Sequence, residues 1–249
     1  MTMLQTRGVT KRFGSLVAVK DVSMSVKSGE LRAIIGPNGA GKTTFFNMIS
    51  GYFPPTSGSI LLEGSDVTQV PAHLRVGMGM GRTFQITEIF PELTVHENVL
   101  TAAEIVAGQT LHMLPNKADA KLVNDVARET LALVGLTAKA ERLVGELSHG
   151  DQRTTEIAMA LAQNPRLLLL DEPTAGMGDQ ETYEITALIR RLHRERSYTI
   201  ILIEHDMRVV FNLADFITVL DRGSLLAEGT PKDIAASAAV QAAYLGESQ

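Results

Sequence analysis

Residues 36–43 read Gly-Pro-Asn-Gly-Ala-Gly-Lys-Thr and match the G-x-x-x-x-G-K-[ST] pattern of a phosphate-binding loop. Glycines allow backbone N–H groups to surround phosphate oxygens, and a helix that starts here would add its positive dipole end. Lys42 would place a mobile positive charge beside the β- and γ-phosphates, and the Thr43 hydroxyl would bind Mg²⁺. The pattern therefore predicts a site for a nucleoside triphosphate. The residues assigned to nucleotide binding in this loop are Gly36, Asn38, Gly39, Gly41, Lys42, Thr43 and Thr44.

An apolar run at residues 167–170 ends in two adjacent acids, Asp171 and Glu172. At the carboxyl end of a parallel strand, side chains face the ligand crevice. Asp171 is therefore expected to hold Mg²⁺, directly or through water, and Glu172 is expected to polarise the water that attacks the γ-phosphate. In the alternative, these acids only begin the polar loop before Pro173. This alternative is less favoured because the same chain carries a phosphate-binding loop.

A second nucleotide motif has to be weighed, because residues 116–119 read Asn-Lys-Ala-Asp, the N-K-x-D pattern by which GTPases read guanine. In GTPases this motif ends a buried strand, whereas here it follows a segment without strand alternation. No Asp-x-x-Gly follows the acidic strand either. We interpret residues 116–119 as the polar start of a helix over residues 118–134.

A strand–loop–helix unit must carry the phosphate-binding loop. Residues 31–35 are a compact apolar run that predicts the strand, and residues 43–50 predict the helix, which Gly51 and the Pro54-Pro55 pair would end. Further buried strands are predicted at residues 167–171, 200–204 and 217–220, with a helix at 180–196. Buried strands that alternate with helices predict a parallel α/β core.

Two segments depart from this alternation. Short strands with alternating polarity are predicted at residues 3–9 and 22–26, ahead of the core. Residues 95–163 read as mainly helical, with an irregular patch near 108–116, and we interpret about residues 86–163 as a helical insertion into the core. The chain has no long linker, low-complexity tract or internal repeat, so one domain is expected over residues 1–249.

Composition restricts the class of protein. The 249 residues include no cysteine, which excludes disulfides and thiolate metal sites and suits a reducing cytosolic compartment. The formal net charge of −5 argues against a nucleic-acid partner. No secretory signal is recognised, and the longest apolar runs have the length of a strand, far short of a membrane span. Any role at a membrane is therefore expected to come through a partner protein.

Several further segments resemble motifs of the ATP-binding subunits of ABC transporters and follow the family's order along the chain. Residues 147–153, Leu-Ser-His-Gly-Asp-Gln-Arg, resemble the LSGGQ signature, and residues 175–177 occupy the D-loop position. Gln85 resembles the Q-loop glutamine and His205 resembles the switch histidine. Phe13 resembles the aromatic residue that stacks on adenine. The resemblance covers essentially the whole chain.

This resemblance implies a RecA-like P-loop NTPase fold with an N-terminal antiparallel β subdomain and an inserted helical subdomain, and it implies hydrolysis of ATP with Mg²⁺. Gln85 would bridge Mg²⁺ or the attacking water, and His205 would contact the γ-phosphate and orient Glu172. The signature of one subunit would cap the ATP held by the phosphate-binding loop of a second ATPase subunit, identical or different. The signature residues assigned to this contact are Ser148, Gly150 and Asp151.

The signature departs from the family pattern at His149 and at Asp151, where the family carries a glycine and a glutamine. His149 is bulkier but still exposes its backbone. Asp151 is the more serious change, because it puts a carboxylate near the start of a phosphate-binding helix. Charge repulsion there would weaken the ATP-bound dimer, unless the side chain turns towards the ribose hydroxyls.

Within the family, the chain most resembles the ATPases of importers for hydrophobic (branched-chain) amino acids, amides and urea. The segments that carry this likeness are Glu-Pro-Thr-Ala-Gly-Met at 172–177, Ile-Glu-His-Asp-Met at 203–207 and Ala-Tyr-Leu-Gly-Glu at 243–247. Such a subunit works at the cytoplasmic face of the inner membrane, on transmembrane permease subunits and indirectly on a solute-binding protein. The two alternative hypotheses are that the chain is an ATPase of lipopolysaccharide export or a soluble ABC ATPase.

Residues 86–93, Ile-Thr-Glu-Ile-Phe-Pro-Glu-Leu, place apolar side chains directly after Gln85. An apolar patch on such a subunit is typical of a partner surface, and by the same resemblance a short permease helix would dock here. The alternative is that Ile89, Phe90 and Leu93 pack the helical insertion onto the core.

Overall fold

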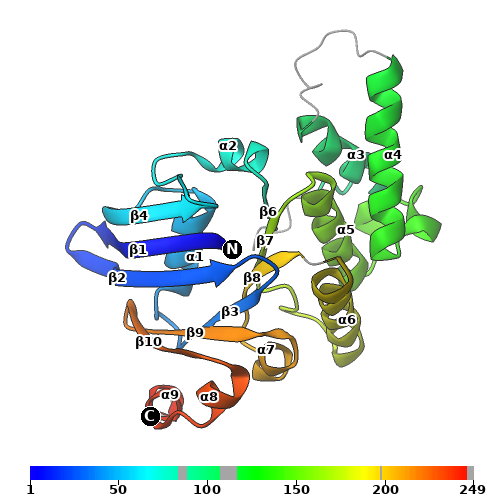
Figure 1. The fold of residues 1–249 in the computed structure, drawn as a ribbon. Helices are drawn as coiled ribbons and strands as arrows, with labels where there is room; N and C mark the ends of the chain where they lie inside the picture. Colours follow the sequence, from blue (N-terminus) through cyan, green and yellow to red (C-terminus); the bar gives the residue numbers. More distant parts are fainter. Residues whose placement is uncertain (84–88, 107–116, 197, 246–249) are drawn as a thin grey trace.

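The computed structural model describes residues 1–83, 89–106, 117–196 and 198–245. Its central sheet has the strand order β10-β9-β3-β8-β7-β6 (Figure 1). These strands are β3 Leu31–Ile35, β6 Met80–Arg82, β7 Leu167–Asp171, β8 Thr199–Ile203, β9 Phe216–Asp221 and β10 Ser224–Gly229. All except β10 run parallel, because β10 pairs antiparallel with β9. The carboxyl ends of the parallel strands therefore meet at one edge of the sheet, where such sheets bind ligands.

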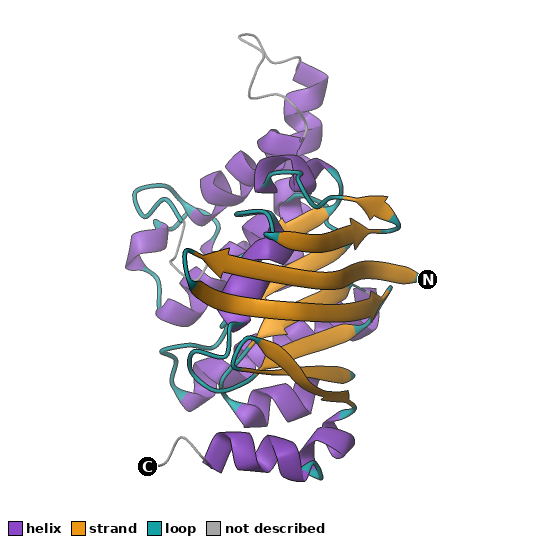
Figure 2. Ribbon diagram, turned by 90° about the vertical axis from the view of Figure 1, so that its left-hand side faces the viewer, coloured by secondary structure: helices purple, strands orange, loops and turns teal. Residues whose placement is uncertain are grey.

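A second, antiparallel sheet forms an outer layer and has the strand order β2-β1-β4-β5. Its strands are β1 Thr2–Phe13, β2 Leu16–Lys27, β4 Ser57–Leu62 and β5 Ser65–Asp66. Figure 2 looks onto this layer, with the strands of the central sheet and then most of the helices behind it. Helix α1 (Lys42–Ser50) packs Phe45, Phe46 and Met48 into one apolar cluster with residues of both sheets.

The remaining helices lie mainly on the other face of the central sheet and at its ends (Figure 1). They are α2 Ala72–Gly77, α3 Val95–Val106, α4 Lys117–Val134, α5 His149–Ala162, α6 Asp179–Arg196, α7 Met207–Leu213, α8 Pro231–Ala235 and α9 Ala238–Leu245. Short 3₁₀ turns at Thr137–Lys139 and Val144–Glu146 connect α4 to α5. None of the described helices is both long enough and apolar enough to cross a membrane.

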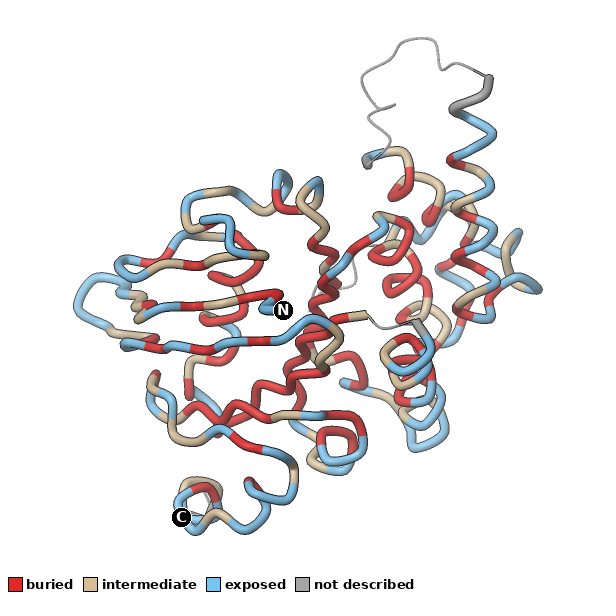
Figure 3. The backbone as a smooth tube through the Cα atoms, in the orientation of Figure 1, coloured by how far each residue is buried: buried red, intermediate tan, exposed pale blue. Residues whose placement is uncertain are grey.

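The central strands are buried almost throughout (Figure 3). Their side chains alternate between two apolar cores. Leu167 and Leu169 point into the cluster with α1, whereas Leu168 and Leu170 point into the cluster with the helices of the other face. Continuous burial explains why β7 reads as an unbroken apolar run rather than an alternating one. The same alternation puts Asp171, which continues the row of Leu167 and Leu169, on the α1 side of the sheet.

The predicted fold class is confirmed, and most predicted elements of the core are found within one residue of the expected ends. The outer strands differ: β1 and β2 extend well beyond the predicted 3–9 and 22–26. Register shifts along β1, for example between Thr6 and Val9, interrupt the alternation on which a strand prediction depends. The predicted irregular patch at 108–116 lies outside the described residues, as does Asn116 of the guanine-like motif.

Candidate functional site

The phosphate-binding loop connects the carboxyl end of β3 to the start of α1 and has a conformation that requires glycine at two positions. Gly41 has φ 94°, and a Cβ atom there would lie 2.5 Å from the carbonyl oxygen of Ala18. A Cβ atom on Gly36 would lie 2.1 Å from the carbonyl oxygen of Leu220. Lys42 Nζ donates hydrogen bonds to the carbonyl oxygens of Gly36 (2.6 Å) and Pro37 (2.9 Å), so the ammonium lies across its own loop.

A cavity of about 650 Å³ opens over this loop, a size within the usual range for small-molecule sites. Most of the predicted loop residues line it, and so do Glu172 from the end of β7 and His205 from the end of β8. The lining residues that sequence reasoning did not assign to the site are Leu16, Val17, Ala18, Ala40, Arg222 and Gly223. The fold therefore brings the phosphate-binding loop, the second acid and the predicted switch histidine to one cavity, from three separate segments.

Glu172 and His205, which both line the cavity, contact each other. Nε2 of His205 lies 2.9 Å from Oε1 of Glu172. The backbone of Glu172 has φ 46°, a left-handed conformation that is costly for a residue with a side chain and is held here by a hydrogen bond from its N–H to the carbonyl oxygen of Ile203 (3.0 Å). The turn after β7 therefore aims the Glu172 carboxylate at the histidine and at the phosphate-binding loop.

Glu204 is a buried acid that was not predicted as a site residue. Its carboxylate holds the backbone on both sides of the Glu172–His205 contact. Its Oε1 accepts hydrogen bonds from the backbone N–H (3.0 Å) and hydroxyl (2.5 Å) of Thr174. Its Oε2 accepts a hydrogen bond from the N–H of His205 (2.9 Å). Glu204 thus connects the turn that carries Glu172 to the residue that carries the imidazole. The sequence signal that could have identified Glu204 is an acid directly after a buried strand, because a buried carboxylate needs hydrogen-bond donors.

Asp171 lies behind the cavity rather than in its wall, and its residue is 1% exposed. Burial raises the pKa of its carboxyl above the ordinary value, Arg82 opposes that rise, and the neighbouring charge of Glu172 adds to it. Among the described residues, Oδ1 of Asp171 has no hydrogen-bond partner. Mg²⁺ prefers oxygen ligands, so this buried carboxylate oxygen and the Thr43 hydroxyl fit a magnesium site.

The signature residues lie at the start of α5, away from the cavity. Ser148 is the N-cap, and its hydroxyl oxygen accepts a hydrogen bond from the N–H of Asp151 (3.2 Å). The N–H of Gly150 donates to Oε1 of Glu181 at 3.1 Å. Oδ2 of Asp151 lies 2.5 Å from Nζ of Lys139, so the carboxylate that was expected to repel phosphate has a cation beside it. The sequence did not identify Lys139, which is twelve residues upstream.

Phe13 lies at the end of β1 and is 47% exposed. Its ring makes a T-shaped contact with Phe53, with ring centres 5.6 Å apart, and Nζ of Lys11 lies over both rings. Phe13 does not line the cavity that the described residues enclose. Gln85, which was also predicted to act on Mg²⁺ or the attacking water, falls in 84–88, outside the described residues.

Comparison with known proteins gives the family. A profile described as ABC transporter matches residues 19–175, and one described as branched-chain amino acid ATP-binding cassette transporter matches residues 224–248. The high-affinity branched-chain amino acid transport ATP-binding protein BraF of Pseudomonas aeruginosa is 40% identical, over 98% of this chain and 98% of BraF. The lipopolysaccharide export system ATP-binding protein LptB of Haemophilus influenzae is 34% identical, over 99% of this chain and 98% of LptB.

Solved structures agree with this assignment. The ADP conformation of MJ1267, an ATP-binding cassette of an ABC transporter, matches with a TM-score of 0.87 and 31% identity, over 99% of each chain. The dimeric post-hydrolysis state of the cassette MJ0796 bound to ADP and Pi matches with a TM-score of 0.76 and 27% identity, over 92% of this chain and 99% of MJ0796. The chain therefore belongs to the ABC transporter family, within which it is an ATP-binding cassette of the ATPase class.

Proposed function

We propose that this cassette hydrolyses ATP to drive the import of branched-chain amino acids or related small amides through membrane permeases. The convergence of the phosphate-binding loop, Glu172 and His205 on one cavity is the observation that carries the catalytic part of the proposal. The likeness of residues 224–248 to the branched-chain amino acid profile, together with the relative BraF, supports the substrate class.

Each side chain has a separate role in this proposal. Lys42 leaves the carbonyl oxygens of its own loop to bind the β- and γ-phosphates, and Phe13 stacks on the adenine ring. Glu172 accepts a proton from the attacking water, while His205 holds the Glu172 carboxylate in place and contacts the γ-phosphate. Asp171, Thr43 and Gln85 would hold Mg²⁺, which would neutralise charge on the phosphate oxygens.

The signature residues are proposed to act on the nucleotide of a second cassette. Ser148 and the N–H of Gly150 lie at the N-terminus of α5, where a helix binds anions, but they do not line the cavity of their own chain. A site that is split in this way is complete when two cassettes face each other head to tail around two ATPs. The dimeric state of the similar cassette MJ0796 supports such an arrangement.

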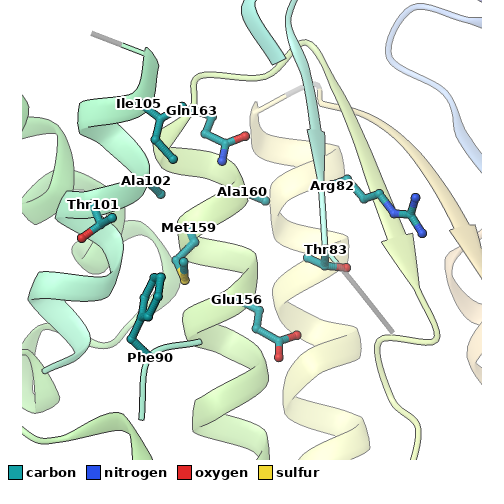
Figure 4. Close-up of a pocket in the computed structure, with 10 residues that line it drawn as sticks. All are labelled: Arg82, Thr83, Phe90, Thr101, Ala102, Ile105, Glu156, Met159, Ala160 and Gln163. Atoms are coloured by element: carbon teal, nitrogen blue, oxygen red, sulfur yellow. The ribbon is translucent and has the colours of Figure 1, made fainter. Parts of the chain in front are cut away.

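Coupling to the permeases is proposed at a pocket between β6 and helices α3 and α5, which we call the helical pocket (Figure 4). Its volume is about 250 Å³, and Phe90, Ile105 and Met159 give it an apolar wall. Ile89 is partly buried against the core, whereas Phe90 is 49% exposed. Of the three described residues Ile89, Phe90 and Leu93, Phe90 is the exposed one and is therefore available to a docking segment. This contact would hold the cassette at the cytoplasmic face of the inner membrane.

Reconstitution of the complete transporter tests this proposal. The tagged chain is purified from membranes together with the proteins that bind it, and the complex is placed in vesicles with radiolabelled leucine and a solute-binding protein. We expect leucine uptake that requires Mg-ATP and stops in the Glu172→Gln variant. Co-purification of membrane proteins that extract lipopolysaccharide, with no amino-acid uptake, would favour the LptB-like function instead. Failure to bind any membrane protein would contradict both.

A further inference from the structure

The guanidinium of Arg82 links helix α1, which follows the phosphate-binding loop, to Asp171 at the end of β7. Arg82 is the last residue of β6, and its side chain is 12% exposed. It donates a hydrogen bond to Oδ1 of Asn47 (2.7 Å) and another to the hydroxyl of Ser50, both on the helix that follows the phosphate-binding loop. The same group lies 3.4 Å from Oδ2 of Asp171. One planar cation therefore contacts α1 and the buried acid together.

This contact is of a kind that orients a metal ligand. Arg82 approaches Oδ2 of Asp171, which leaves Oδ1 without a hydrogen-bond partner among the described residues. A hydrogen-bond donor beside a metal-binding carboxylate fixes the direction of that carboxylate, and its loss typically costs about ten- to a hundredfold in metal affinity. A guanidinium is suited to the task because its planar fork holds several donors in fixed directions, whereas an ammonium is a compact charge on a flexible stem.

A second arginine supports Asp171 through the backbone. Arg153 of α5 donates a hydrogen bond to the carbonyl oxygen of Asp171 and forms a buried ion pair with Glu156. Arg82 and Glu156 both line the helical pocket (Figure 4). The pocket wall is thus connected to Asp171 directly through Arg82 and indirectly through the Glu156–Arg153 pair.

We propose that Arg82 is a positioning residue that sets Asp171 relative to α1 for Mg²⁺-dependent nucleotide binding. The inference rests on the proposed function, because it takes Asp171 as a ligand of Mg²⁺. It adds a residue that does not line the cavity over the phosphate-binding loop.

The test measures nucleotide binding, not turnover. A fluorescent ATP analogue is titrated into the full-length Glu172→Gln protein at increasing Mg²⁺ concentrations, and separately with EDTA. Arg82→Met should raise the Mg²⁺ concentration for half-maximal binding by about tenfold or more, the usual effect of losing such a partner. Affinity measured with EDTA should stay at the parent value. Arg82→Lys, which keeps the charge but not the fork, should give a smaller shift.

Arg128→Met is the matched control, because Arg128 is an exposed residue of α4 and should leave the Mg²⁺ dependence unchanged. Thermal unfolding shows whether Arg82→Met folds. If it does not, Arg82→Lys and Asn47→Ala test the inference instead, and both should raise the Mg²⁺ concentration for half-maximal binding. Unchanged midpoints in these variants, or an equal loss of affinity with EDTA, would overturn the inference. A parent protein that binds no nucleotide with Mg²⁺ would instead refute the proposed function.

Discussion

Nζ of Lys139 lies 2.5 Å from Oδ2 of Asp151, which joins the 3₁₀ turn after α4 to the first turn of α5. A negative side chain in the first turn stabilises a helix, but it would repel a phosphate that approaches the same N–H groups. The ion pair offsets this repulsion. The ion pair would therefore allow a cassette with Asp151 in its signature to bind phosphate at the start of α5, as proposed above.

Removal of the Lys139 charge should weaken the ATP-bound dimer. In the Glu172→Gln background, light scattering with Mg-ATP should show the mass of a dimer. Lys139→Ala should raise the protein concentration needed for dimerisation by about fivefold, the upper end of what a partly exposed pair contributes. The double variant with Asp151→Gln should recover the parent behaviour, because the uncompensated charge is gone.

Lys121→Ala is the control for this series, since Lys121 is an exposed lysine of α4. If Lys139→Ala dimerises as well as the parent, or if Asp151→Gln fails to restore it, the ion pair has no part in dimerisation. The same assay without Mg-ATP should give the monomer for every variant.

Lys42→Ala should lose ATP affinity by about ten- to a hundredfold, the effect of removing hydrogen bonds to a charged group. The Lys42 ammonium also donates hydrogen bonds to the carbonyl oxygens of Gly36 and Pro37, and the variant removes these two hydrogen bonds as well. Calorimetric titration with Mg-ATP measures the change. Lys20→Ala removes an exposed lysine that does not line the cavity and should bind as the parent does. Equal affinity of Lys42→Ala and the parent would remove Lys42 from its role.

Phe90→Ser should leave the basal ATPase rate and thermal stability of the free subunit nearly unchanged but prevent assembly with the permeases. The segment is held by its backbone, because the buried Asn98 side chain bonds both the N–H (2.8 Å) and the carbonyl oxygen (3.0 Å) of Phe90. Co-purification and vesicle uptake give the readout, with Leu122→Ser on the exposed surface of α4 as the control. Unaltered uptake, or an unfolded subunit, would show that Phe90 does not dock a partner.

The core and the segments proposed to bind and hydrolyse ATP could be predicted from the sequence because both depend on local pattern. The phosphate-binding loop needs its glycines in order, and β7 needs a continuous apolar run, so each is visible within a few residues. Glu204, Lys139 and Arg82 are different, because their roles depend on which strands and turns meet in space. The strand that carries Arg82 has only three residues, Met-Gly-Arg, too few for any period to be recognised.

The pairing of Glu172 with His205 at 2.9 Å, beside the phosphate-binding loop, makes Glu172 the residue on which the account depends most. Its replacement by glutamine keeps the size of the side chain and removes the base. Nucleotide should then still bind, since Lys42 and the backbone N–H groups remain, while turnover should fall by about a hundredfold or more.

Steady-state hydrolysis of Mg-ATP by Glu172→Gln, measured beside its nucleotide affinity, is the most direct test. Glu184→Gln, on the exposed face of α6, is the control and should hydrolyse ATP at the parent rate. We predict parental affinity and a rate reduced at least about a hundredfold for Glu172→Gln. Parental affinity with an unchanged rate would contradict the assignment of this cavity as the site of ATP hydrolysis.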